Sequence, residues 1–150
     1  MAGAALELRA NVKGADAVGR SLAEMLRGVD DLTPLMDEIG AILVSSTQDR
    51  FERGRGPDGA AWLPSGRVLS EGGQTLVDSG ILLASITHVP GNDQVEVGSN
   101  MVYAGIHQFG GEAGRRGATK LPARPYLGIG FGDQAEIEAA AADYLEGLAQ

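Results

Sequence analysis

The chain has 150 residues, of which 43% are hydrophobic and 21% charged, so its size and composition are those of a single soluble globular domain, residues 1–150. Its net charge of −8 argues against a surface that mainly grips DNA phosphates, and the absence of cysteine excludes disulfides, thiolate metal sites and a cysteine nucleophile. The sequence shows neither a signal-peptide pattern nor a run of about 20 apolar residues, so we expect a cytoplasm-like compartment and no membrane partner.

The first third of the chain predicts a strand followed by two helices. Residues 5–12 alternate between apolar and polar side chains, which is the period of a half-buried strand. Residues 16–29 carry apolar side chains at helical spacing and predict an amphipathic helix. A second helix is predicted over 33–53, with Thr33 as its cap and Pro34 at its first position, where a missing N–H costs nothing.

The middle of the chain predicts a long loop over 54–75 that is rich in glycine and proline. Trp62 is the one aromatic residue of this loop and is expected to anchor it on the core. A loop of this length is normally functional or disordered. After the loop, Asp78 is expected to cap a short helical turn over 79–84.

The second half predicts a hairpin and two helices. Residues 85–89 and 94–98 have the pattern of strands joined by a Pro-Gly-Asn-Asp turn. Residues 101–109 predict a short helix that Gly110 terminates. Asp133 begins a capping-box pattern and predicts the start of the last helix.

Together these elements predict an α+β fold, in which a small, mostly antiparallel sheet packs against helices. The sequence contains 23 glycines, about twice the usual share of an ordinary protein, and they cluster outside the predicted helices. We therefore expect two long, flexible, glycine-rich loops, at about 54–75 and 110–124.

Patterns typical of catalysis or ligand binding are weak. His88 and His107 have no further ligands at the spacing of a metal site, so each is expected to fill space and to hydrogen-bond a neighbour. Asp78-Ser79-Gly80 lacks the first glycine of a nucleophile elbow, and the glycines of 54–59 lack the lysine of a phosphate-binding loop. We expect no catalytic residue, no cofactor and no metal.

Charge is distributed unevenly along the C-terminal part of the chain. Residues 110–124 carry a net charge of +3, whereas residues 133–150 hold five acids and no base. The cations of the first segment are Arg115, Arg116, Lys120 and Arg124. Two interpretations stay open: both segments are simply solvated, or the basic loop of one copy meets the acidic helix of the next in a ring.

Several segments between residues 34 and 130 occur in a distinctive order. They include Pro57-Asp58-Gly59 ahead of Trp62, then 76–82, 103–111 and 122–128. This order resembles the phage virion morphogenesis family, which comprises Mu-like and tail-completion-type proteins. The residues of this chain that carry the motif are Asp78, Gly80, Tyr103, His107, Gln108, Gly110, Gly111 and Pro125.

The resemblance implies a structural protein rather than an enzyme, one that completes the phage tail, forms the neck ring that joins tail to head, or does both. The implied partners are copies of the chain itself, the tail tube and the head–tail connector proteins. The ring would have six copies if it matches a tail tube, and DNA would at most pass through its channel. The protein would be located in the tail or neck of the virion, and in the host cytoplasm during assembly.

We expect the contacts with copies or partners to lie in the two glycine-rich loops and the segment that follows. The expected contact residues are Trp62, Arg115, Arg116, Lys120, Arg124 and Tyr126. Two alternatives remain: a nucleic-acid-binding adaptor that uses the basic loop over 115–124, and a small hydrolase that uses His107 with a nearby acid.

Overall fold

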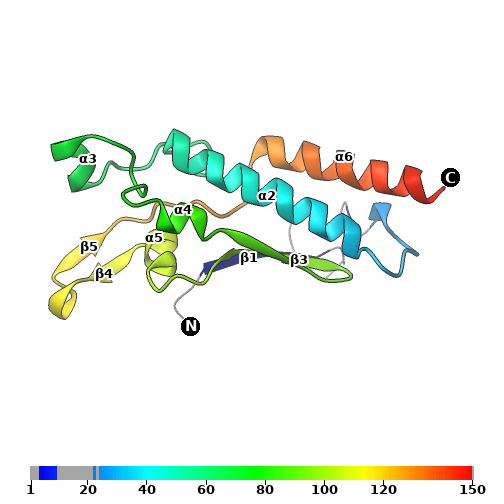
Figure 1. Cartoon of the computed structure of the whole chain (residues 1–150), viewed down its shortest axis with the longest axis horizontal. Coiled ribbons are helices and arrows are strands. Elements are labelled where there is room, and N and C mark those ends of the chain that lie inside the picture. The colour runs from blue at the N-terminus through cyan, green and yellow to red at the C-terminus, as the bar shows by residue number, and fades with distance from the viewer. Residues whose placement is uncertain (1–3, 10–21, 23, 150) are drawn as a thin grey trace.

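The computed structural model describes residues 4–9, 22 and 24–149 of the chain. Two long helices, α2 (Thr33–Arg53) and α6 (Phe131–Leu148), pack against each other, and α2 also packs on a three-stranded antiparallel sheet (Figure 1). The predicted α+β fold is confirmed. None of the helices in the described part of the chain is both long and apolar enough to cross a bilayer.

The sheet has the strand order β1-β3-β2. Its strands are β1 (Ala4–Arg9), β2 (Thr87–Pro90) and β3 (Gln94–Ser99). β2 and β3 form the predicted hairpin, in which Thr87 lies opposite Gly98. β1 pairs with the other edge of β3, with Leu6 opposite Val97. Val95 and Val97 are buried, so β3 is the central strand on which α2 packs.

The remaining elements gather at one end of the molecule, at the left of Figure 1, while α6 ends at the opposite side. They are α3 (Gly66–Glu71), α4 (Ile81–Ala84), α5 (Ala104–Phe109), β4 (Gly111–Ala113), the 3-10 turn η1 (Arg115–Gly117) and β5 (Thr119–Leu121). β4 and β5 pair as an antiparallel hairpin. The predicted helix over 101–109 is confirmed with a later start, and Gly110 is its C-cap.

The core combines aliphatic side chains with one aromatic cluster. α2 contributes Leu35, Met36, Ile39, Leu43 and Phe51. The Phe51 ring centroid lies 5.7 Å from that of Trp62, at an interplanar angle of 80°, and 5.2 Å from that of Tyr126. The cluster therefore joins the end of α2 to two segments that are distant in sequence, and such pairs stabilise beyond their area alone.

The start of α2 differs from the prediction. Leu32, not Thr33, is the N-cap residue, so Pro34 lies at the second position of the helix and not at the predicted first. The Asp31 carboxylate accepts hydrogen bonds from the Thr33 N–H (3.0 Å) and from the Thr33 hydroxyl (2.6 Å). Thr33 thus donates its hydroxyl instead of accepting with it, and a local aspartate turn precedes the helix.

The other two predicted caps are also wrong. Gly130 is the N-cap of α6, and Asp133 is three residues further on, where its carboxylate accepts the Gly130 N–H at 2.7 Å. Gly80 is the N-cap of α4. The Asp78 carboxylate instead forms an ion pair with Arg67, whose Nε lies 3.6 Å from Asp78 Oδ1. In each case the carboxylate binds a different donor from the one that the sequence pattern predicts.

The predicted loop over 54–75 has internal structure. Its middle forms α3, whose first turn Ser65 caps by accepting a hydrogen bond from a backbone N–H at 3.3 Å. Arg67 donates from Nη2 to the Gln74 carbonyl at 2.7 Å and closes the segment after α3. Trp62 is 7% exposed and anchors the loop on the core, as predicted.

Two predicted elements extend beyond the described part of the chain, because residues 10–21 and 23 are not described. The predicted strand over 5–12 is confirmed as far as Arg9. Most of the predicted helix over 16–29 lies outside the described residues, and its described part is helical as far as Met25.

Candidate functional site

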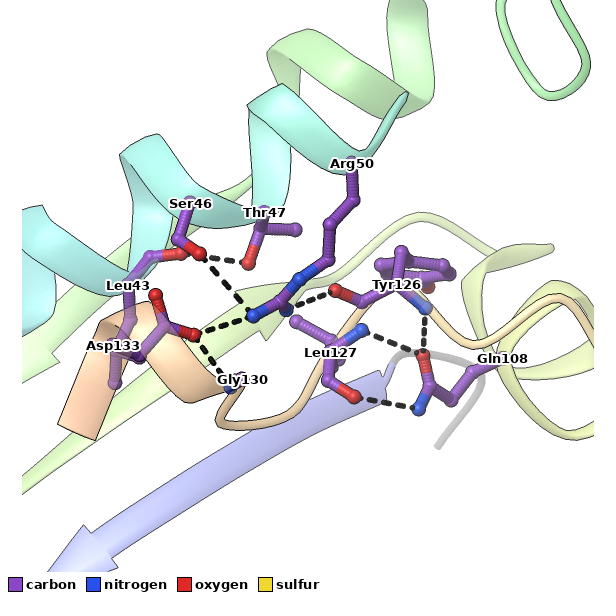
Figure 2. Close-up of polar contacts among 9 residues, drawn as sticks. All are labelled: Leu43, Ser46, Thr47, Arg50, Gln108, Tyr126, Leu127, Gly130 and Asp133. Carbon is purple, nitrogen blue, oxygen red and sulfur yellow. Dashed lines mark hydrogen bonds and ion pairs between the residues drawn. The ribbon is translucent and has the colours of Figure 1, made fainter. Parts of the chain in front are cut away.

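Residues 122–128, which we call the return segment, connect the β4–β5 hairpin to α6 and are held by side chains from distant elements. Arg50 of α2 donates from Nη1 to the Tyr126 carbonyl at 2.7 Å (Figure 2). Trp62 donates its indole N–H to the Pro125 carbonyl at 2.8 Å. Two consecutive carbonyls of the return segment are therefore satisfied by side chains, which fixes the path of a segment that has no secondary structure.

Gln108 of α5 holds the return segment from the other side (Figure 2). Its Oε1 accepts the N–H groups of Tyr126 and Leu127, both at 3.0 Å, and its Nε2 donates to the Leu127 carbonyl at 3.2 Å. The Tyr126 hydroxyl donates to the Ala104 carbonyl at 2.7 Å. Because Tyr126 is fully buried, burial raises the pKa of its hydroxyl to about 12. Gln108 and Tyr126 thus hold α5 against the return segment.

A buried ion pair joins α2 to the start of α6. Arg50 Nη2 lies 2.6 Å from Asp133 Oδ2, and both side chains are 8% exposed. The same nitrogen donates to the Ser46 hydroxyl at 3.2 Å, and the same carboxylate oxygen accepts the Gly130 N–H (Figure 2). Burial lowers the pKa of Arg50, and the Asp133 carboxylate opposes that shift. Each charge is therefore compensated and hydrogen-bonded, as a buried pair requires.

Gly110 lets α5 end against the return segment. Its φ of +75° lies in the left-handed region. A Cβ atom at this position would lie 2.7 Å from the Ala123 backbone nitrogen, a contact that real side chains do not make. Both the backbone angle and the close approach therefore require glycine here, and Gly111 then begins β4 on the exposed surface.

A pocket of about 420 Å³ lies between the loop 65–82, α5 and β5. Its lining includes Asp78, Gly80, Tyr103, His107 and Arg124, which are predicted motif or contact residues. The rings of Tyr103 and His107 meet edge to face with centroids 5.9 Å apart. The structure therefore brings together, around one cavity, residues that are up to 46 positions apart in the sequence.

The two histidines have different surroundings. His88 Nε2 lies 2.8 Å from Asp37 Oδ1, so the predicted space-filling, hydrogen-bonded histidine is confirmed there. The Nδ1 atom of His107 is buried and has no hydrogen-bond partner among the described residues, so that prediction is wrong for His107. Burial, and to a lesser degree the charge of Arg124, lowers the pKa of His107. Within the described part of the chain, no three His, Asp or Glu side chains gather as a metal site would need.

The sequence matches a known protein family. Residues 14–146 match the model of the Phage virion morphogenesis family. The chain belongs to this family. The resemblance that the motif residues carry in the sequence is thereby confirmed.

Two relatives extend the comparison. Mu-like prophage FluMu G protein 2 of Haemophilus influenzae is 35% identical over 135 residues, which cover 90% of this chain and 94% of the relative. Putative capsid assembly protein G of Escherichia phage Mu is 37% identical over 110 residues, which cover 66% of this chain and 70% of the relative. No solved structure matches this chain.

Three of the predicted contact residues of this family member are buried within their own chain. Trp62 is 7% exposed, Arg124 5% and Tyr126 0%. Each has been taken into the packing around the return segment, so Trp62 and Tyr126 offer little side-chain surface in this fold, and the role of the three residues in contacts with partners stays a prediction. The same residue types, a tryptophan, an arginine and a tyrosine, are typical of interfaces, which is why the sequence suggested that role.

The other three predicted contact residues, Arg115, Arg116 and Lys120, are exposed on the β4–η1–β5 hairpin. We call them the hairpin cations. Only one carboxylate, Glu112, lies on the same hairpin. Their role in contacts with partners stays a prediction.

Sequence reasoning missed the Arg50–Asp133 pair, although one signal pointed to Arg50. In the sequence, Arg50 follows Leu43 by seven positions and Thr47 by three, which places it on the buried stripe of α2. A cation on a buried stripe needs a buried acceptor. Nothing local identifies Asp133 as that acceptor, because the two residues are 83 positions apart.

Proposed function

We propose that this member of the Phage virion morphogenesis family is a structural protein without enzymatic activity, and that its copies form a ring that completes the tail and joins it to the head. Family membership supports a role in virion morphogenesis. The relative in phage Mu is named as a putative capsid assembly protein, which supports work during particle assembly. The partners would be the tail tube and the head–tail connector, and the ring would be located at the tail end or neck.

The observation that carries the proposal is the position of two oppositely charged surfaces. The β4–β5 hairpin, which carries the hairpin cations, lies at one end of the molecule, and the C-terminal half of α6 extends to the other end (Figure 1). The exposed acids of α6 are Glu136, Asp143 and Glu146. One copy cannot bring its own hairpin to the far end of its own α6, whereas a second copy placed end to end can.

Such a contact joins two different surfaces and is therefore heterologous. A heterologous contact closes into a ring when the rotation between neighbours divides a full turn evenly, and it otherwise gives an open filament. Complementary charges would fix the register of neighbouring copies and speed their association. We propose six copies for a ring that matches a tail tube, with DNA passing through the channel.

The test is a phage that lacks this gene, with its lysate viewed by negative-stain electron microscopy. The proposal predicts filled heads beside separate or abnormal tails, and joined particles when the wild-type gene is supplied in trans. Supplying Arg115→Glu/Arg116→Glu should leave heads and tails separate. The control Arg27→Glu/Arg53→Glu changes two exposed arginines elsewhere and should restore joining. Normal joined particles from the deletion phage would refute the proposal.

A second candidate, the nucleic-acid-binding adaptor, is favoured by the exposure of the same hairpin cations. Three phosphate contacts would give a slope of about −2.7 for the logarithm of the binding constant against that of the salt concentration. Fluorescence anisotropy with a labelled duplex measures this slope, and no binding at 50 mM salt rejects the adaptor. The hydrolase alternative gains no support, because no carboxylate of the described residues pairs with His107.

A further inference from the structure

Arg124 is a second buried arginine of the described chain, and its surroundings differ from those of Arg50. Arg124 is 5% exposed, and its Nε donates to the Leu63 carbonyl at 2.7 Å. Arg50 has Asp133 beside it, whereas no carboxylate of the described residues lies within ion-pair distance of Arg124. The described residues give its Nη atoms no acceptor, and these atoms are not among the enclosed unpartnered ones, so they can donate to an acceptor that comes from outside the chain.

Arg124 lines the pocket between the loop 65–82, α5 and β5, and the other walls define what fits there. Leu76, Leu82 and Leu121 make part of the wall apolar. At the same site, Ile81 is 51% exposed and Tyr103 37% exposed. The lining also contains Arg67 and Asp78, which form an ion pair with each other at 3.6 Å. His107, whose pKa is lowered, adds an unpartnered Nδ1. The pocket therefore suits a ligand that combines an apolar side chain with an acceptor for the Arg124 guanidinium.

The C-terminal end of α6 has this combination. Leu148 is 54% exposed, and Glu146, on a different side of the same helix turn, is also exposed. The last turn of a helix also has free carbonyls and the negative end of the helix dipole, and α6 has no basic residue in its last turn to compensate them. The elements that line the pocket, among them α4, α5 and β5, lie away from the C-terminal end of α6 (Figure 1), so the helix end must come from another copy.

We propose that the pocket lined by Arg124 and Ile81 receives the C-terminal end of α6 from a second copy. Leu148 of the incoming helix contacts the apolar wall, and the last carbonyls of that helix accept hydrogen bonds from Arg124, while Glu146 adds negative charge at the same helix end. This inference rests on the proposed ring and names the contact that would hold neighbouring copies together, with the hairpin cations beside it.

The test uses two variants of the full chain, each of which destroys one half of the contact. Ile81→Asp places a negative charge at the pocket and suits the first turn of α4. Glu146→Lys/Leu148→Lys reverses the helix end at exposed positions. Val89→Asp and Glu38→Lys are matched controls, because they make similar changes at exposed positions outside both the pocket and α6.

Sedimentation equilibrium over a concentration series gives the association state of each protein. We expect concentration-dependent self-association of the wild type and of both controls, with dissociation constants within threefold of one another. Each contact variant alone should associate at least tenfold more weakly. A 1:1 mixture of the two contact variants retains one intact pocket and one intact helix end, so it should form a dimer and nothing larger.

The contribution of Arg124 is read directly by NMR in that mixture. With ¹⁵N in the Glu146→Lys/Leu148→Lys copy, the Arg124 Nε–H resonance should shift on addition of unlabelled Ile81→Asp copy, while that of Arg55 should not. The inference is overturned if the wild type stays monomeric, if both contact variants associate like the wild type, or if the Arg124 resonance does not move. If association instead depends only on Arg115 and Arg116, this contact is wrong and the ring proposal stands.

Discussion

Removing the charge of Asp133 tests most directly how much the buried Arg50–Asp133 ion pair contributes to the stability of the fold. Asp133→Asn keeps the shape of the side chain, and its amide oxygen can still accept the Gly130 N–H. Arg50 would then be a cation at 7% exposure with no carboxylate, still fixed by its bond to the Tyr126 carbonyl. Breaking a buried pair in this way costs about 3–5 kcal/mol. That is a large share of the about 5–15 kcal/mol by which domains are usually stable.

The double variant Arg50→Met/Asp133→Asn separates the charge from the packing. Methionine fills much of the space of the arginine stem but leaves the Tyr126 carbonyl without its donor, which costs about 1–3 kcal/mol. Because no unpaired charge remains, the double variant should be more stable than Asp133→Asn alone. We expect a coupling free energy of about 2–3 kcal/mol between the two positions.

Urea unfolding followed by circular dichroism measures these free energies, and an unchanged slope against urea concentration shows that only stability has changed. Asp49→Asn is the matched control, because it breaks the Asp49–Arg53 pair of the same helix, whose side chains are 49% and 71% exposed. An exposed pair of this kind contributes less than about 1 kcal/mol. If Asp133→Asn costs no more than Asp49→Asn, or if the double variant is less stable than both single variants together predict, the ion-pair argument is wrong.

Three further predictions concern single residues. Gly40→Ala should destabilise the fold by about 1–3 kcal/mol, because its Cβ would overlap the His88 ring where α2 crosses β2, whereas Gly147→Ala in open space on α6 should stabilise it by up to about 1 kcal/mol in the same urea assay. Because His107 has a lowered pKa in the fold, the unfolded chain binds the proton first, so stability should fall as the pH drops below about 6.5, and His107→Gln should flatten this dependence. Because Tyr126 has a pKa raised to about 12, the unfolded chain loses its proton first, so stability should fall as the pH rises above about 10, and Tyr126→Phe should remove that loss.

The elements with local signals were predictable from the sequence. The β2–β3 hairpin follows from the Pro-Gly-Asn-Asp turn between two alternating runs, and the end of α5 follows from Gly110, which both the backbone angle and the close approach require. Helix starts were less predictable. Asp31, Asp78 and Asp133 can each accept from several backbone or side-chain donors, and the fold decides which donor is near.

The residues of the candidate site could be predicted from the sequence, but which of them are buried and which are exposed could not. The order of aromatic, arginine and glycine residues over 103–128 resembles the family. In the structure several of these residues contact one another, as Gln108 does Tyr126 and Tyr103 does His107. Sequence cannot show that Trp62 and Tyr126 point inward, because both types are equally typical of cores and of interfaces. The partners of Arg50 and of Leu6 are far away in the sequence, so only the folded chain reveals them.

The place of β1 in the sheet has a consequence for how the chain folds as it is made. β1 pairs only with β3 in the described sheet, so the first strand has no neighbour until the ribosome has passed Ser99. The hairpin of β2 and β3 can form early because its loop is short, whereas closing the long stretch between β1 and β3 is slow. Arg50 gains its carboxylate partner later still, when Asp133 at the start of α6 has been synthesised. A product truncated before β3 would leave β1 unpaired, and one truncated before Asp133 would lack the acceptor of Arg50, so truncated products would present unpaired strand edges or an unpaired buried charge to the cell's proteases.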